Sequence, residues 1–310
     1  MENKILGLHH ITAIAGNAKQ NLNFYTKVLG QRLVKKTVNF DDPGTYHFYF
    51  GNEVGTPGTI LTFFPWEGIG KGRNGTGMAT GIGYSVPKDS LEFWADRFKQ
   101  FNVKHEKIAE KFGEKYLHFE DPDGLQIDFS EAQNEDKRKP WTGEINNDFA
   151  TRGFHNVTLT LKKVDPTAAI LTDVLGYNLL KQEGNRYRFV TSSIDNAAIV
   201  DLLEEPDSKG GINAAGTNHH VAFRVKDDTI LMDYCEKVLS KGLNITPKID
   251  RDYFFSLYFR EPGGVLFELA TDNPGFDKDE PVSELGSHLK LPAQYESARA
   301  QIEKGLPVLN

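Results

Sequence analysis

The chain has 310 residues, 39% of them hydrophobic and 25% charged, a composition typical of a globular protein with one or two full cores. Its formal net charge of −7 provides no basic field that would attract nucleic acid or anionic lipid. The single cysteine, Cys235, excludes a disulfide framework, and no apolar run approaches the roughly 20 residues of a membrane helix. Because residues 1–5 also lack the apolar core of a signal peptide, we expect a cytoplasmic protein without nucleic-acid or membrane partners. The oligomeric state stays open, a homo-oligomer included.

The chain begins with a unit that returns later. Residues 8–31 predict a strand and then an amphipathic helix, with Gly30 where a helix C-terminus favours positive φ. Residues 154–177 repeat this plan, and the Val-Leu-Gly signature at 28–30 recurs at 174–176, 146 residues later. A self-similarity of this length predicts two related halves.

A second kind of unit also occurs twice. Residues 79–129 and 218–269 each predict a strand, a helix and further strands, and each ends in a Gly-x-x-x-acid motif. These motifs place Asp128 and Glu268 140 residues apart. We therefore predict an α+β fold of four β-α-β-β-β modules in two tandem halves.

The domain boundaries follow from this plan. We predict an N-terminal domain of two modules at 1–135 and a C-terminal domain of two modules at 150–275. Polar residues 131–147 are the natural linker. The remainder, 276–310, is expected to be a tail with a helix from about 292 to 304, closed by a glycine.

Two histidine pairs, His9-His10 and His219-His220, open predicted strands in different halves. Successive strand residues point to opposite faces, so one histidine of each pair can face a shared interior, although the alternation does not choose which. Glu268 is the best candidate for an acidic partner. Two histidines and one carboxylate with open positions suit a non-haem Fe(II) that handles oxygen.

The repeat predicts one complete ligand set. Aligned halves place Asn156 where the first module has His10, and Ala79-Thr80 where the fourth has His219-His220. Asp128 is therefore interpreted as a solvated or hydrogen-bonded relic of the repeat and not as a ligand. The remaining unassigned histidines are interpreted as surface or second-layer residues; they are His47, His105, His118 and His288.

The four-module plan resembles the vicinal oxygen chelate superfamily, which includes glyoxalases, bleomycin-resistance proteins and type I extradiol dioxygenases. More narrowly, the chain is similar to the hydroquinone ring-cleaving dioxygenases. The resemblance covers nearly the whole sequence. It is carried by the motifs Leu8-His9-His10-Ile11-Thr12, Gly30 to Thr37, Gly55-Thr56-Pro57-Gly58-Thr59, Arg152-Gly153-Phe154-His155, His219-His220, and Glu261-Pro262-Gly263-Gly264-Val265-Leu266-Phe267-Glu268.

The resemblance implies roles for individual residues. The second histidine of each pair and the strand-end glutamate would hold Fe(II), which selects His10, His220 and Glu268. An arginine and a tyrosine beside the iron correspond to Arg251 and Tyr258. Residues that the resemblance places along the pocket are His9, Thr12 and His219.

The activity implied is an extradiol-type opening of hydroquinone-type aromatic diols with O2. Arg251 would stabilise negative charge, Tyr258 would donate a hydrogen bond, and His9 or His219 could carry a proton. Two alternatives stay open, namely a glyoxalase-like lyase or isomerase and a non-catalytic protein that binds aromatic compounds. If these two residues have no catalytic role, Tyr258 is a buried aromatic residue with a hydrogen-bonded hydroxyl, and Arg251 forms a surface salt bridge.

Overall fold

The computed structural model describes residues 4–309. Residues 1–3, the first of the predicted N-terminal domain, and Asn310, the last of the predicted tail, lie outside the described part. Four successive β-α-β-β-β modules and a C-terminal tail make up the chain, as predicted. Among the described residues, no helix is both long and apolar enough to span a membrane.

The element bounds are as follows. The first module contains β1 (Leu8–Ala15), α1 (Ala18–Asn23), a π-helical turn (Phe24–Val28), β2 (Arg32–Asn39), β3 (Asp42–Gly51) and β4 (Ile60–Pro65). The second contains β5 (Met78–Val86), α2 (Leu91–Gln100), β6 (Ala109–Lys111), β7 (Glu114–Glu120) and β8 (Gln126–Glu131). The third contains β9 (Gly153–Leu161), α3 (Asp165–Asp173), β10 (Asn178–Glu183), β11 (Arg186–Val190) and β12 (Ile199–Glu204). The fourth contains β13 (Thr217–Val225), α4 (Asp228–Ser240), β14 (Ile249–Asp250), β15 (Phe254–Arg260) and β16 (Leu266–Pro274).

Local sequence explains where the helices begin and end. Asn17 caps α1 by accepting a hydrogen bond from the backbone N–H of Gln20, and Asp227 caps α4 in the same way through Ile230. The helical segment after β1 ends at Gly30, whose φ of +67° is the left-handed conformation that glycine adopts at no steric cost.

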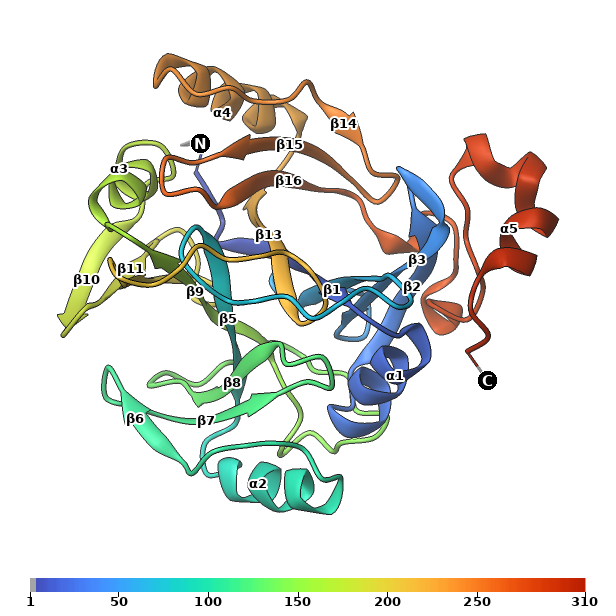
Figure 1. The fold of residues 1–310 in the computed structure, drawn as a ribbon, viewed down its shortest axis with the longest axis horizontal. Helices are drawn as coiled ribbons and strands as arrows, with labels where there is room; N and C mark the ends of the chain where they lie inside the picture. Colours follow the sequence, from blue (N-terminus) through green and yellow to red (C-terminus); the bar gives the residue numbers. More distant parts are fainter. Residues whose placement is uncertain (1–3, 310) are drawn as a thin grey trace.

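The strands form two eight-stranded sheets that join modules from different predicted domains. The first has the order β14-β15-β16-β13-β1-β4-β3-β2, and the second has the order β10-β11-β12-β9-β5-β8-β7-β6. Strand β1 pairs antiparallel with β13, and β5 pairs antiparallel with β9 (Figure 1). The first module therefore combines with the fourth, and the second with the third. This pairing places the two histidine-bearing strands side by side.

One buried hydrophobic cluster extends through all four modules, from Leu8 on β1 to Leu269 on β16. The apolar face of α2 contributes Trp94 and Phe98 to it, both fully buried. The two sheets therefore share one continuous core, which fixes the position of the strands that carry the histidine pairs.

The tail packs against the edge of the first sheet, beside β2 and β3 (Figure 1). The side chain of Lys35 on β2 is fully buried and lies 2.6 Å from carboxylate oxygens of both Asp279 and Glu280. The predicted tail helix is present as a 3-10 segment (Ala293–Ala298) followed by α5 (Arg299–Gly305). The tail thereby covers the outer edge of β2, which would otherwise expose unpaired backbone groups.

A glycine in the tail provides a test of this packing. Gly286 has φ of +78°, and an added Cβ would overlap the backbone carbonyl oxygen of Leu33. We expect Gly286→Ala to lower the free energy of unfolding by about 1–3 kcal/mol, measured by urea denaturation. The control Gly305→Ala, where a Cβ meets nothing within 4 Å, should be neutral. Equal stability of both variants would contradict the close tail contact.

Candidate metal centre

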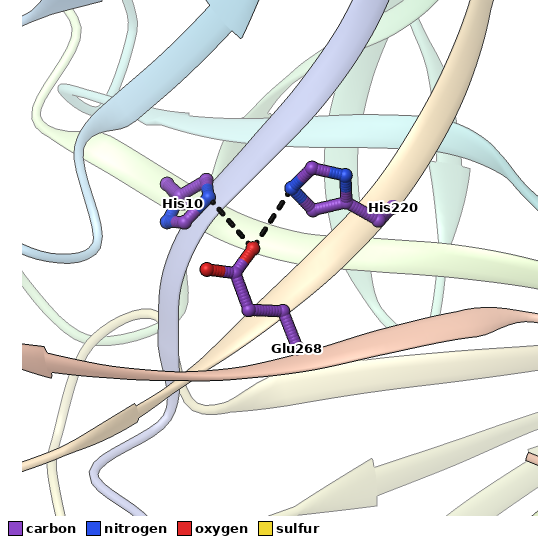
Figure 2. Close-up of side chains that lie close together, drawn as sticks. All are labelled: His10, His220 and Glu268. Atoms are coloured by element: carbon purple, nitrogen blue, oxygen red, sulfur yellow. Dashed lines mark ion pairs between the residues drawn. The ribbon is translucent and has the colours of Figure 1, made fainter. Parts of the chain in front are cut away.

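Three side chains converge at the centre of the first sheet. His10 comes from β1, His220 from β13 and Glu268 from β16, and each is at least 94% buried. The Oε2 atom of Glu268 lies 3.2 Å from Nε2 of His10 and 2.8 Å from Nε2 of His220 (Figure 2). One potential ligand atom from each residue lies within 4.8 Å of the others. They are the one group of this kind among residues 4–309.

Two β-bulges explain how both members of each histidine pair gather here. Along the β1–β13 ladder, Leu8 pairs with Phe223 and His10 pairs with Ala222, so His9 is an extra residue on β1. In the same ladder, Thr12 pairs with His220 and Ala13 pairs with Asn218, so His219 is an extra residue on β13. A bulge breaks the strict alternation of side chains and redirects them, which the sequence pattern alone does not reveal.

The preceding histidine orients the following one in each pair. Nδ1 of His9 lies 2.9 Å from Nδ1 of His10, and Nδ1 of His219 lies 2.8 Å from Nδ1 of His220. The ring of His9 donates from Nε2 to the carbonyl oxygen of Thr271 at 3.1 Å, and burial lowers its pKa well below the usual value. Because this neutral ring then accepts at Nδ1, we assign the Nδ1 proton to His10, which directs the Nε2 lone pair of His10 towards Glu268.

The charge state of the cluster suits a cation. Burial would raise the pKa of Glu268, but the neighbouring His10 and His220 hold it well below its usual range, so the carboxylate is ionised. Burial lowers the pKa of His220 and so disfavours an imidazolium as the positive partner of this carboxylate, whereas the neutral imidazole is the form that binds metals. Nε2 of His220 and Oε2 of Glu268 are buried without a hydrogen-bond partner among the described residues. These two atoms are acceptors that face each other without a donor, and a divalent cation bound by both would satisfy them.

A serine holds the carboxylate in place. The hydroxyl of Ser256, on β15, is fully buried and donates to Oε1 of Glu268, leaving Oε2 to face the imidazoles. We expect Ser256→Ala to weaken metal binding by about tenfold, because outer-shell partners typically contribute 10–100-fold, as measured by competition with a coloured chelator. The control Ser130→Ala removes a buried hydroxyl that has no hydrogen-bond partner among residues 4–309, and metal affinity should not change. An unaltered affinity in Ser256→Ala would show that Glu268 needs no support.

A cavity of about 260 Å³ opens in front of the cluster. It is lined by His10, Thr12, Asn39, Phe40, Asp41, His47, Tyr49, Phe64, Trp66, His219, His220, Arg251, Phe254, Tyr258 and Leu266. Arg251 and Tyr258, expected beside the iron, and Thr12 and His219, expected along the pocket, thus line the same cavity. Arg251 forms both kinds of contact that were considered for it, because its Nε donates to the Tyr258 hydroxyl at 3.3 Å and its guanidinium forms an ion pair with the exposed Asp41 at 3.6 Å.

His9 does not line this cavity, contrary to the expectation. It lies behind His10 against the ring of Phe254, with ring centroids 5.2 Å apart, and its bond to the Thr271 carbonyl keeps it there. Burial lowers the pKa of His219 to about 4, so this cavity-lining imidazole is neutral at pH 7 and can accept a hydrogen bond.

His47 was interpreted as a surface or second-layer residue, and this was wrong, because its ring lines the cavity. Its Nε2 lies 2.9 Å from the hydroxyl of Thr62, and its Nδ1 lies 3.0 Å from the hydroxyl of Tyr49. Thr62 in turn lies 2.9 Å from the hydroxyl of Thr12. The alternation of β3, which gives His47 and Tyr49 one face, was the available signal.

The second sheet has no equivalent metal cluster within the described chain. Its β5–β9 ladder carries bulges at Thr80 and His155, so Thr80 matches His219 and Gly81 matches His220. The sequence alignment of this strand was therefore wrong by one residue, because a bulge shifts the register without changing the pattern. Asn156, which matches His10, donates its amide to Asp201 at 2.8 Å. No imidazole stands at either ligand position.

The comparisons with known proteins agree with the fold and the site. A sequence profile described as "Glyoxalase/Bleomycin resistance protein/Dioxygenase superfamily" matches residues 7–129 and 153–269. The chain is 47% identical over 307 residues to the Bacillus subtilis protein named "Putative ring-cleaving dioxygenase MhqO", covering 99% of this chain and 97% of that protein. It is 35% identical over 308 residues to the "Chlorohydroquinone/hydroquinone 1,2-dioxygenase" of Sphingobium indicum, covering 96% and 95% of the two chains.

A crystal structure described as a "putative dioxygenase" from Bacillus subtilis superposes with a TM-score of 0.95 at 46% identity, covering 99% of this chain and 98% of that one. Names of these relatives support a dioxygenase with an aromatic substrate, and His10, His220 and Glu268 form a possible metal site. From its four modules, its tandem sheets and these matches, the chain belongs to the Glyoxalase/Bleomycin resistance protein/Dioxygenase superfamily, with the vicinal oxygen chelate fold.

Proposed function

We propose that this protein is an Fe(II)-dependent, extradiol-type ring-cleaving dioxygenase that opens hydroquinone-type aromatic diols with O2. The observation that carries the proposal is the buried meeting of two imidazoles and one carboxylate, with an aromatic-walled cavity directly in front of them. Two histidines and one carboxylate on one side of a metal leave positions open, the arrangement typical of non-haem Fe(II) oxygenases. The name of the Sphingobium relative supports the hydroquinone class.

Within this proposal, His10, His220 and Glu268 hold the iron. Fe(II), when bound, supplies Lewis acidity that favours an ionised phenol and redox chemistry towards O2. Glu268 contributes one negative charge to a fully buried site, which favours a divalent over a monovalent cation.

The cavity walls select the substrate. Phe64, Trp66 and Phe254 line the cavity and provide aromatic surfaces against which a single ring can pack. A cavity of about 260 Å³ suits a single-ring diol, and the apolar walls disfavour a highly charged ligand.

Polar groups at the cavity act on the oxygen atoms of the substrate. Arg251 is a permanent cation and stabilises negative charge on a phenolate. Tyr258 donates its hydroxyl proton in a hydrogen bond, because its pKa is raised well above the usual value, first by burial, and the group stays protonated. The neutral ring of His219 can accept a hydrogen bond from a hydroxyl of the diol. Thr12 also lines the cavity, and its hydroxyl lies 2.9 Å from that of Thr62.

Anaerobic reconstitution with Fe(II), followed by oxygen-electrode assays on hydroquinones and catechols, tests the proposal. We expect uptake of one O2 per hydroquinone, loss of the aromatic absorbance, and incorporation of both atoms from 18O2 into the open-chain acid. Turnover of a thiohemiacetal without O2 would establish a lyase or isomerase instead. Stoichiometric retention of aromatic compounds without turnover, in the presence or absence of metal, would establish a binding protein.

A further inference from the structure

The second sheet contains counterparts of three residues at the metal site, namely Arg251, Tyr258 and Glu268. One residue on each of β6, β7 and β8 lies 140 positions before a residue of the metal site. The later residues lie in the turn before β15, on β15 and on β16, respectively. The pairs are Lys111 with Arg251, His118 with Tyr258, and Asp128 with Glu268. The ladders confirm the match, because His118 pairs with Asp128 on β7 and β8 as Tyr258 pairs with Glu268 on β15 and β16.

These counterpart residues border an open cavity of about 690 Å³. Its charged lining residues, apart from His118, are Arg73, Glu106, Lys111, Asp128, Arg186, Glu205 and Lys209. The lining contains four Lys or Arg side chains and three Asp or Glu side chains, so its formal net charge is +1 before His118 is counted.

Hydrogen bonds make His118 a further cation. Its Nδ1 lies 2.6 Å from Oδ1 of Asp128, and its Nε2 lies 2.7 Å from the side-chain oxygen of Gln126. Both partners are acceptors, so both ring nitrogens donate, as in an imidazolium. The hydrogen bond to Asp128 also raises the pKa of His118. Lys111 contacts the other oxygen of Asp128, so one carboxylate faces two cations.

Three cations that line the cavity have no carboxylate partner among the described residues, and one of them, Arg73, donates to the carbonyl oxygen of Gly210 at 3.0 Å. Arg186 on β11 donates only to the hydroxyl of Thr158, at 3.4 Å. Lys209 is exposed at the rim, and its ammonium group contacts no carboxylate in the described part of the chain. Glu205, also at the rim, accepts from the hydroxyl of Ser208 at 2.6 Å. A guanidinium left free in a cavity is a ready partner for a carboxylate.

We propose that this cavity, named here the second-sheet pocket, binds a small organic acid without a metal. The carboxylate of the ligand would pair with Arg186 and Thr158, and its other end would face the Lys111–His118 wall and the ring of Tyr116. A metal is disfavoured because Gly81 and Asn156 stand at the two histidine positions, and the Asn156 amide is engaged by Asp201. The proposal is independent of the activity proposed for the metal site.

Titration calorimetry at low salt tests the proposal, with benzoate, maleate and inorganic phosphate as probes. We expect benzoate or maleate to bind once per chain, and Arg186→Gln to weaken this binding at least tenfold. Because Arg186 is half-buried, the exposed Lys209→Gln provides a second variant that cannot disturb the fold, with an expected weakening of about threefold. Lys88→Gln, which removes an exposed charge elsewhere, is the control and should bind as the wild type does.

Binding that survives in Glu268→Gln would place the acid away from the metal site, as proposed. Loss of binding in that variant, or equal affinity in Arg186→Gln and wild type, would overturn the assignment. The absence of binding by both organic acids would overturn it as well. Phosphate that binds as tightly as the organic acids would show a general anion site and contradict the selectivity proposed here.

Discussion

Exchanging Glu268 for glutamine is expected to abolish metal retention and ring cleavage together. The substitution keeps the shape of the side chain but removes the one negative charge that faces His10 and His220. Since outer-shell changes at metal sites already cost 10–100-fold in affinity, loss of a direct ligand should cost at least about 100-fold. Anaerobic Fe(II) titration and oxygen uptake measure the two losses.

Thermal stability separates this effect from misfolding. A metal at 100 times its Kd stabilises the native state by about 2.7 kcal/mol, and Glu268→Gln should lose this increment while the metal-free protein still folds. Glu114→Gln is the matched control, because Glu114 is also buried and lies 2.9 Å from a histidine, His155, in the second sheet. That variant should lose stability but keep the full metal-dependent increment. An unchanged rate in Glu268→Gln would exclude Glu268 as a ligand.

Replacing Tyr258 by phenylalanine is expected to reduce kcat by about 100-fold while iron stays bound. The hydroxyl lies at the cavity, accepts from Arg251 at 3.3 Å, and is positioned to donate to an oxygen of the substrate or of O2. Removal of one such donor typically costs 10²–10³-fold in kcat. Steady-state oxygen uptake at saturating hydroquinone, with iron content measured in the same sample, provides the readout.

Tyr177→Phe is the control for this substitution. Tyr177 is fully buried outside the cavity, and its hydroxyl has no hydrogen-bond partner among the described residues. This variant should retain wild-type kcat and iron content. Loss of iron from Tyr258→Phe would instead make Tyr258 a ligand or a structural support, because its ring also contacts His220 edge-on at 5.6 Å.

The repeat in the sequence was sufficient to predict the modules, because helix and strand periodicity survive in each copy. The repeat could also select Glu268, since the acidic residue stands four positions after a recognisable glycine in both halves. The choice of His10 and His220 within their pairs came from the family resemblance alone. Physically, that choice depends on bulges at His9 and His219, and a bulge leaves no periodic signal in one strand.

The ligand set drawn from both halves implied that the first and fourth modules meet, but the strand pairing that joins them was not evident from the sequence. Strand β1 pairs with β13, so the first module shares a sheet with the fourth. This long-range pairing is decided by which faces bury together, not by sequence proximity. It also explains why the cavity contains residues such as Phe64 and His47, whose roles depend on strands that meet only in the folded protein. The division into domains at 1–135 and 150–275 and the cytoplasmic location stay predictions.

An anomalous difference map at the iron absorption edge, from crystals grown anaerobically with Fe(II), tests the central claim most directly. We predict one peak per chain, bounded by Nε2 of His10, Nε2 of His220 and a carboxylate oxygen of Glu268, with no peak beside Asp128 in the second sheet. A peak that excludes Glu268, or one in the second sheet, would contradict the assignment of the metal centre.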